Sequence, residues 1–273
     1  MYPEAVSLFA SSVKYMKRTL IHQLKASLML QNVGRKQHQP PLQSYPGIMS
    51  ERLIAIGDIH GCMTALERLL DSIHPTAEDT LVTLGDYVDR GPDSRGVIER
   101  LIQLGGETRH VGLMGNHEEM MLEVVKHQAP HEMWLRHGGV DTLDSYAFAG
   151  SLDFLPDSHL EFFESLVDFH EERGHFFTHA AYAPKIPLNE QAADMLRWHS
   201  LDDMVPQPHL SGKVAVVGHT ANKDGEILDL GHLICVDTYC YGGGWLTAIE
   251  LHSGQVWQVS KDGELREQKA RQR

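Results

Sequence analysis

The chain has 273 residues, 42% of them hydrophobic, which suits one large globular domain or two small ones. A formal net charge of −13 disfavours general binding to nucleic acid, and no apolar stretch is long enough to cross a membrane. The cysteines, Cys62, Cys235 and Cys240, form no CxxC pair, so a disulfide scaffold is disfavoured and a reducing, cytoplasmic compartment is expected.

The first 48 residues differ from the rest of the chain. They hold six basic side chains and one acidic one, which leaves a net charge of −18 on residues 49–273. Acid-poor, basic composition is typical of a targeting presequence, but Met49-Ser50-Glu51-Arg52 also reads like a natural start. We therefore expect residues 1–48 to be a basic N-terminal extension, poorly ordered or a start-site artefact.

From residue 53 the chain alternates short apolar runs with stretches of helical spacing. Strands are predicted at 53–56, 81–84 and 111–114. Helices are predicted after each of them, over 63–73, from a cap at Asp93 or Ser94 through Ile102, and after the third strand. This alternation predicts a largely parallel sheet, with a site beyond the carboxyl ends of its strands.

The second half of the chain changes character. Residues 130–170 are predicted to be mostly helical, with Trp134, Leu135, Val140, Leu143 and Tyr146 as packing residues. Further strands are predicted at 176–178, 214–217, 233–236, 245–251 and 255–260, the last two joined by a hairpin. We expect them to form a mostly β layer against the first sheet.

Five strand ends carry Asp, His or Asn, four of them beside glycine, and the candidate metal ligands are Asp58, His60, Asp86, Asn116, His179 and His219. Any one alone would as readily be a turn or capping residue, but five in one chain are hard to obtain by chance. Carboxylate, imidazole and amide oxygen suit Mn, Fe or Zn. Six ligands exceed one tetrahedral zinc but suffice for two ions if Asp86 bridges them.

Two ions about 3.5–4 Å apart would hold a bridging hydroxide and a phosphate for in-line attack. His117 is then the expected general acid for the leaving oxygen, and Asp89 would orient its imidazole. Arg90 would offer a bidentate fork to the phosphate oxygens. The alternatives are a helix-capping role for Asp89 and a surface salt bridge for Arg90.

Three segments resemble the signatures of the metal-dependent phosphoprotein phosphatases, within the calcineurin-like metallophosphoesterases. They are Gly57-Asp58-Ile59-His60-Gly61, Gly85-Asp86-Tyr87-Val88-Asp89-Arg90-Gly91 and Gly115-Asn116-His117-Glu118. His179 and Gly218-His219 resemble the two later histidine motifs, so the resemblance covers roughly residues 53–250. The stretch Asp237–Gly244 resembles a segment of compact bacterial members, whereas Ala181 stands where many members have glycine.

The resemblance implies an α/β four-layer fold, a central β-sandwich flanked by helices, as the catalytic domain of residues 49–273. It implies one ion on Asp58, His60 and Asp86, and a second on Asp86, Asn116, His179 and His219, most often manganese, with iron or zinc as alternatives. It also implies His117–Asp89 as the acid pair and Arg90 and Asn116 as phosphate contacts. Arg197 is the candidate for a further phosphate-binding arginine, with Arg173 as the alternative, and Asp237 is expected to support the site.

The expected activity is hydrolysis of phosphoserine and phosphothreonine on proteins. The alternative is a hydrolase of dinucleoside polyphosphates such as diadenosine tetraphosphate. The resemblance implies that such enzymes tend to lack the acid of the second motif and to carry Asn-His-Asp in the third, so Asp89 and Glu118 favour the protein phosphatase. A non-catalytic phosphoprotein-binding module would lack a ligand or the general acid. The physiological phosphoester, the native metals and the oligomeric state stay open.

Overall fold

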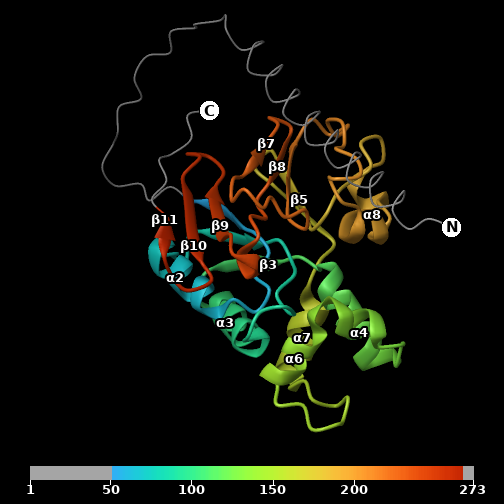
Figure 1. The fold of residues 1–273 in the computed structure, drawn as a ribbon. Coiled ribbons are helices and arrows are strands. Elements are labelled where there is room, and N and C mark those ends of the chain that lie inside the picture. The colour runs from blue at the N-terminus through green and yellow to red at the C-terminus, as the bar shows by residue number, and fades with distance from the viewer. Residues whose placement is uncertain (1–50, 267–273) are drawn as a thin grey trace, which may run out of the picture. The chain divides into compact units, whose positions relative to one another are not determined.

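The computed structural model describes residues 51–266, and all statements below concern these residues. The predicted extension of residues 1–48 lies outside them. Within residues 51–266, none of the helices has the length and apolar character needed to cross a membrane. Two β-sheets with helices beside them make up this part of the chain (Figure 1).

The first sheet has six strands in the order β11-β10-β9-β1-β2-β3. Their bounds, in that order, are Leu265–Arg266, Val256–Ser260, Trp245–Glu250, Leu53–Ile56, Thr80–Thr83 and Arg109–Gly112. Strands β1, β2 and β3 run parallel, as predicted, and β9, β10 and β11 are added antiparallel. Strand β3 begins two residues before its predicted start because an edge strand does not need an apolar beginning.

The second sheet has five strands in the order β4-β5-β6-β8-β7. Their bounds, in that order, are Phe169–Glu172, His175–Thr178, Val214–Val217, Leu233–Cys235 and Leu228–Asp229. Strands β5, β6 and β8 are parallel, whereas β4 and β7 are antiparallel edges. The prediction that β9 and β10 belong to this layer was wrong, since β9 pairs with β1 in the first sheet. A run of apolar residues predicts a buried strand, but it does not predict which other strand pairs with it.

The helices follow the predicted order along the chain. Their bounds are Met63–Ile73 for α2, Ser94–Glu107 for α3, Asn116–His127 for α4, Glu132–Trp134 for α5, Val140–Ser145 for α6, Asp157–Ser165 for α7 and Ala193–Trp198 for α8. Short turns are the π-helical η1 at Leu135–Gly139 and the 3₁₀ turns η2 at Leu188–Glu190 and η3 at Cys240–Gly242. Asp93 caps α3 by accepting a 2.8 Å hydrogen bond from the Gly96 N–H, one of the two caps expected.

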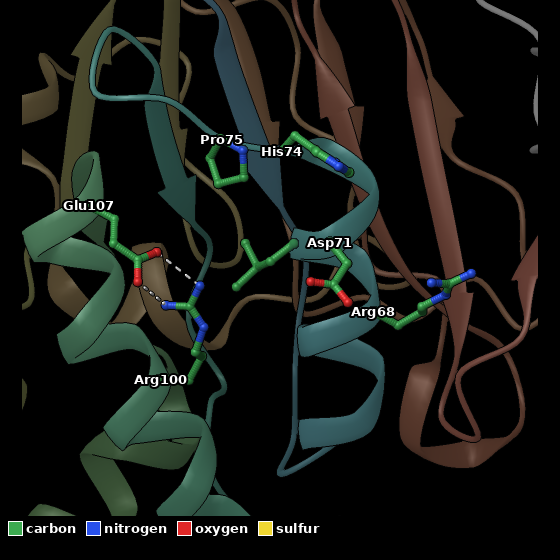
Figure 2. A pocket seen from close by; sticks show the side chains of 7 residues that line it. Arg68, Asp71, His74, Pro75, Arg100 and Glu107 are labelled. Carbon is green, nitrogen blue, oxygen red and sulfur yellow. Dashed lines mark hydrogen bonds and ion pairs between the residues drawn. The ribbon is translucent and has the colours of Figure 1, made fainter.

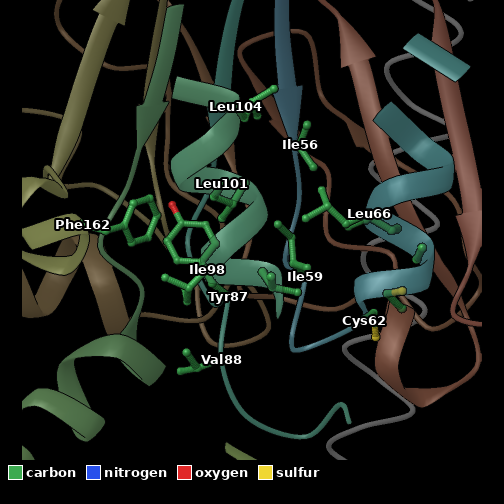
Figure 3. Packing of buried hydrophobic residues seen from close by; sticks show 14 of the residues in the cluster. Ile56, Ile59, Cys62, Leu66, Tyr87, Val88, Ile98, Leu101, Leu104 and Phe162 are labelled. Atoms are coloured by element: carbon green, nitrogen blue, oxygen red, sulfur yellow. The ribbon is translucent and has the colours of Figure 1, made fainter. Parts of the chain in front are cut away.

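Alternating side chains of the strands build three buried clusters, and these define the layers. Leu53 and Ala55 of β1 face the space between the sheets, where they join Phe177 and Val216. Ile54 and Ile56 face the other way and pack under α2 and α3 (Figure 3). The outer face of the second sheet is covered by the segment that holds η2 and α8. The predicted four-layer α/β fold, a β-sandwich flanked by helices, is therefore confirmed.

Candidate metal centre

The carboxyl ends of the parallel strands carry the predicted ligands. Asp58 and His60 follow β1, Asp86 follows β2, His179 follows β5 and His219 follows β6. Asn116 is the first residue of α4, directly after β3 and a short loop. His219 is half-buried and the other ligands are at most 6% exposed, so the fold brings all six together in its interior.

One group of ligand atoms forms around His179, His219 and Asn116. The Nε2 atom of His179 lies 3.1 Å from Asn116 Oδ1 and 3.2 Å from His219 Nδ1, and the last two atoms are 3.0 Å apart. The other ring nitrogens lie 2.7 Å from the Leu84 carbonyl and 3.1 Å from the Trp198 carbonyl. A ring N–H that donates to a carbonyl leaves the opposite nitrogen with a lone pair. Three acceptors therefore point at one another, and a cation at their centre would satisfy them.

A second group forms around His60 and Asp86. His60 Nδ1 lies 2.9 Å from the Val88 carbonyl, so that Nε2 faces inward, 3.4 Å from Asp86 Oδ2. Asp58 accepts the His219 backbone N–H with both oxygens, each at 3.1 Å. Burial, together with the charges of Asp237 and Asp86, raises the pKa of Asp58 well above its ordinary value. An added divalent ion would offset this accumulation of acidic groups.

Asp86 faces both groups. Its Oδ2 is the oxygen near His60, whereas its Oδ1 lies 3.4 Å from His179 Nε2. Burial acts to raise the pKa of Asp86, but the surrounding imidazoles, His179 first, hold that pKa well below its ordinary value. The donor set fits two divalent ions that share the Asp86 carboxylate, as the sequence predicted for this residue.

The ligands sit on unusual backbone. His60, Asp86 and His219 have φ values of 46°, 52° and 62°, a left-handed region that residues other than glycine rarely adopt. The glycines beside them allow close approach: a Cβ on Gly115 would lie 2.3 Å from Asp86 Oδ1, and one on Gly218 would lie 2.2 Å from Asp58 Oδ1. The surrounding structure therefore holds His60, Asp86 and His219 in a conformation that costs backbone energy.

The predicted acid pair is assembled beside these ligands. His117 Nδ1 lies 2.7 Å from Asp89 Oδ2, and Asp89 is fully buried. The other ring nitrogen, Nε2, lies 3.9 Å from Asp86 Oδ2 and thus faces the space between the ligand groups. Burial lowers the pKa of His117, but the charge of Asp86 and the bond to Asp89 together raise it above the ordinary value.

Two further partners of Asp89 were not predicted. Trp134 Nε1 donates to both carboxylate oxygens, at 3.0 and 3.1 Å, and Thr142 Oγ1 donates to Oδ1 at 2.7 Å. Trp134 is buried, as a packing residue should be, but it is also a hydrogen-bond donor. Since these residues lie 45 and 53 positions from Asp89 in the chain, local spacing carries no signal for the contact.

Arg90 lies next to His60. Its Nη1 is 3.2 Å from His60 Nε2, its Nε donates to the His137 carbonyl at 3.4 Å, and its guanidinium lies 4.6 Å from the centre of the Tyr241 ring. The aromatic face and the carbonyl restrict the guanidinium without neutralising it. The group can therefore present a positive fork at the metal centre, as expected for a phosphate contact.

Glu118 has a structural function in the same loop. It is fully buried, and its carboxylate accepts the backbone N–H groups of Asp86 at 2.8 Å, Tyr87 at 2.7 Å, Val88 at 3.2 Å and Gly115 at 3.1 Å. Three of the four bonds hold the loop that carries Asp86 and Asp89, and the bond from Gly115 caps the start of α4. Glu118 therefore acts first on the geometry of this loop, and any effect on the choice of substrate is secondary to that.

The remaining sequence candidates occupy different places. Arg197 bonds to Asp168 at 2.7 Å and to Glu119 at 3.0 Å. Arg173 lies in the turn before β5 and pairs with Glu51, whereas His179 follows the other end of that strand, so Arg173 is at the wrong end of the sheet for a phosphate contact.

Asp237 is buried close to Asp58, where it can support the site as suggested. Its Oδ1 accepts the Tyr239 N–H at 2.9 Å, and burial raises the pKa of Asp237 to about 6. Asp237 therefore adds a further acidic group on the His60 side of the centre, although it was not predicted as a metal ligand.

A surface hollow lies elsewhere, between the C-terminal parts of α2 and α3 (Figure 2). It is lined by Arg68, Leu70, Asp71, His74, Pro75, Arg100 and Glu107. Arg100 is bonded there to Glu107 at 3.0 Å, and none of the metal-ligand candidates lines the hollow. This hollow is therefore separate from the candidate metal centre.

Comparison with known proteins gives a consistent result. A family model described as calcineurin-like phosphoesterase matches residues 51–246. Serine/threonine-protein phosphatase 1 of Salmonella typhimurium is 39% identical over 85 residues, 31% of this chain and 37% of that protein. A symmetrical bis(5'-nucleosyl)-tetraphosphatase of Acidovorax sp. is 36% identical over 124 residues, 35% of this chain and 43% of that protein. The chain spans less than half the length of these curated relatives.

A solved structure of a candidate diadenosine tetraphosphatase superimposes with a TM-score of 0.58 and 24% identity. The match covers 77% of this chain and 94% of that one, and at this identity it supports the fold alone.

Proposed function

Because this chain belongs to the calcineurin-like phosphoesterase family, we propose that it is a metal-dependent phosphomonoesterase that removes phosphate from phosphoserine and phosphothreonine in proteins. Two divalent ions, for which we propose manganese, would supply positive charge at the phosphate oxygens and lower the pKa of the attacking water. Asp58, His60 and Asp86 would hold one ion, and Asp86, Asn116, His179 and His219 the other.

The observation that carries the proposal is the buried His117–Asp89 pair, with its 2.7 Å bond. A phosphoserine ester releases an alkoxide, which needs a proton as the P–O bond breaks. His117 Nε2 faces the ligand groups and can donate that proton, while Nδ1–H stays bonded to Asp89. A nucleotide leaving from a polyphosphate is already a stable anion and needs such an acid less. A well-built acid therefore favours the alkyl ester.

For phosphate binding we propose Arg90, with Asn116 as a second contact. Arg197 stays our candidate for a further one. Since Asp168 and Glu119 already engage its guanidinium, we expect it to contribute through the placement of α8 and its neighbours as much as through its charge.

A second candidate function is hydrolysis of dinucleoside polyphosphates. The similarity to the Acidovorax enzyme favours it, and so does a pair of aromatic rings beside Arg90. Tyr239 and Tyr241 lie 4.9 Å apart between ring centres, and such rings can stack on a nucleobase. A non-catalytic binding module is not supported, because residues 51–266 contain all six ligands and the acid pair.

The two activities can be compared in one assay. Metal-reconstituted full-length protein would be given a phosphoserine peptide and diadenosine tetraphosphate in parallel, and kcat/KM measured for each. We expect the peptide to be the better substrate. A strong preference for the nucleotide would overturn the protein phosphatase proposal and favour the second candidate.

Replacing His117 with Asn tests the acid assignment. Turnover of an alkyl phosphate should fall by about 10²- to 10⁴-fold, the usual contribution of a general acid. 4-Nitrophenyl phosphate should suffer less, because its leaving group hardly needs a proton. Metal content, measured by elemental analysis, should stay the same. Undiminished turnover of the alkyl ester would refute the assignment.

We also propose a cytoplasmic location. The cysteines Cys62, Cys235 and Cys240 are all buried and free, which fits a reducing compartment.

A further inference from the structure

The fully buried Asp89 carboxylate depends on donors from a distant part of the chain. Besides His117, it accepts the indole N–H of Trp134, at 3.0 Å to Oδ1 and 3.1 Å to Oδ2, and the hydroxyl of Thr142 at 2.7 Å. A buried carboxylate stays ionised only when such donors replace water. Because the indole N–H spans both oxygens, it also fixes the plane of the carboxylate relative to the imidazole.

Trp134 is itself held firmly. It ends α5, and the chain continues into η1, which is kinked at Gly138, where φ is 110°. Gly139, at the end of that turn, lies against the indole so closely that a Cβ there would be 2.6 Å from the ring. The same turn bonds Arg90, since the Gly138 carbonyl accepts its backbone N–H at 3.3 Å and the His137 carbonyl accepts its Nε at 3.4 Å.

We propose that Trp134 is a positioning residue for the acid step of catalysis: its indole N–H orients Asp89, which in turn directs His117 Nε2 at the leaving oxygen. In that step the oxygen of the attacking water forms a bond to phosphorus as the P–O bond to the leaving group breaks. The electrons of the broken bond go to the leaving oxygen, which takes the Nε2 proton, and His117 becomes neutral. The proposal rests on the phosphoesterase function, although not on the identity of the substrate. The competing explanation is that the indole only fills space.

Substrates with different leaving groups distinguish a positioning role of Trp134 from simple packing. A mispositioned acid harms only reactions that need the proton, whereas a packing defect harms all reactions alike. We therefore replace Trp134 with Phe, which keeps an aromatic ring and removes the N–H, and measure kcat and KM for phenyl phosphate and 4-nitrophenyl phosphate. For phenyl phosphate, kcat should fall by about 10- to 100-fold, a part of the full general-acid contribution. For 4-nitrophenyl phosphate it should fall by less than about threefold, with KM unchanged.

Trp257→Phe is the matched control, since this half-buried tryptophan of β10 packs on the same cluster as Trp134. It should leave the ratio of the two rates unchanged. Gly139→Ala is an independent variant that moves the indole without changing Trp134. The backbone φ of Gly139 is −60°, which alanine adopts readily, and the new Cβ displaces the indole. It should lower the phenyl phosphate rate selectively, as Trp134→Phe does, and it decides the question if Trp134→Phe does not fold.

The outcomes are distinguishable. Equal losses on both substrates, or an unchanged ratio, in a folded Trp134→Phe or Gly139→Ala enzyme would overturn the positioning role. If the wild-type protein, reconstituted with metal, hydrolyses neither aryl phosphate, the proposed function itself fails. Thermal melting and metal content of each variant show whether it is folded and loaded.

Discussion

Buried acidic side chains have opposite surroundings at the two ends of the first sheet. At the amino ends of β1 and β2, Asp79 is 2% exposed and accepts hydrogen bonds from the backbone N–H, Nε and Nη2 of Arg52, at 3.1, 3.0 and 2.6 Å. Thr76 adds its backbone N–H at 2.8 Å. At the carboxyl ends, burial and the charges of Asp237 and Asp86 instead raise the pKa of Asp58 well above its ordinary value.

This difference separates stability from function within one sheet. Burial acts to raise the pKa of Asp79, but the bonds from Arg52 and Thr76 lower it to about 2, so its charge stabilises the fold. Asp58 of the metal centre has its pKa raised instead, so its charge does not stabilise the fold, and Asp86 lies on left-handed backbone with a φ of 52°. The strained backbone and unfavourable charge at the carboxyl ends of the strands can be tolerated because the hydrogen-bonded charge at their amino ends stabilises the fold.

The largest effect that the comparison predicts is on activity at the carboxyl end. Asp58→Asn removes a charge from the His60 side of the centre, so kcat/KM for 4-nitrophenyl phosphate should fall by more than about 1,000-fold, since several kcal/mol of charge stabilisation is lost. Thermal melting of the chelator-treated protein should be unchanged or raised, because an unfavourable buried charge has gone. Metal content should fall as well.

A clear loss of stability in chelator-treated Asp58→Asn would contradict the comparison. It would mean that the groups around Asp58 stabilise its charge as Arg52 stabilises that of Asp79.

The next largest effect is on stability at the amino end. Asp79→Asn leaves Arg52 half-buried without its charge partner, so the free energy of unfolding should fall by about 2–3 kcal/mol. The steady-state rate on 4-nitrophenyl phosphate should be that of the wild type. Asp71→Asn is the control, since this exposed acid of α2 lies in the nearby hollow (Figure 2) and should change neither quantity. Lost activity in a folded Asp79→Asn protein would show that the two ends are coupled.

The contribution of Asp79 should depend on pH in a defined window. Its pKa is about 2 in the folded protein and about 3.9 in an unfolded chain, so its stabilisation is complete above the unfolded value and is lost as the pH falls toward 2. The stability difference between the wild type and Asp79→Asn should therefore shrink from pH 5 to pH 3. Urea denaturation with chelator present measures it. A difference that stays constant over this range would refute the ionic explanation.

Most of the metal centre could be predicted from the sequence, because its ligands directly follow apolar runs. Asp58, Asp86 and His219 each stand after a strand and beside glycine, and parallel strands bring such positions together. The strands β4, β7 and β11 were missed because short edge strands carry no continuous apolar run.

Contacts between distant segments could not be predicted. The bonds of Trp134 and Thr142 to Asp89 depend on how the helices after α4 return to the loop after β2, and no local pattern encodes that path. The same limit applies to Arg197, whose partners Asp168 and Glu119 come from separate segments. The spacing of apolar residues indicates which face of a helix or strand is buried, whereas the residues that this face contacts depend on the tertiary fold.

The smallest effect concerns left-handed backbone away from the metal centre. His74 caps the C-terminus of α2 with a φ of 48° and is exposed (Figure 2). Its backbone carbonyl accepts Arg52 Nη2 at 3.0 Å. His74→Gly keeps that carbonyl and removes the steric cost, so thermal denaturation should show a gain of about 0.5–1 kcal/mol, with kcat and KM unchanged. His60→Gly, at a φ of 46°, should instead abolish metal binding and activity. If His74→Gly brought no gain, left-handed residues would cost this fold little, and the backbone of the metal centre would store correspondingly little energy.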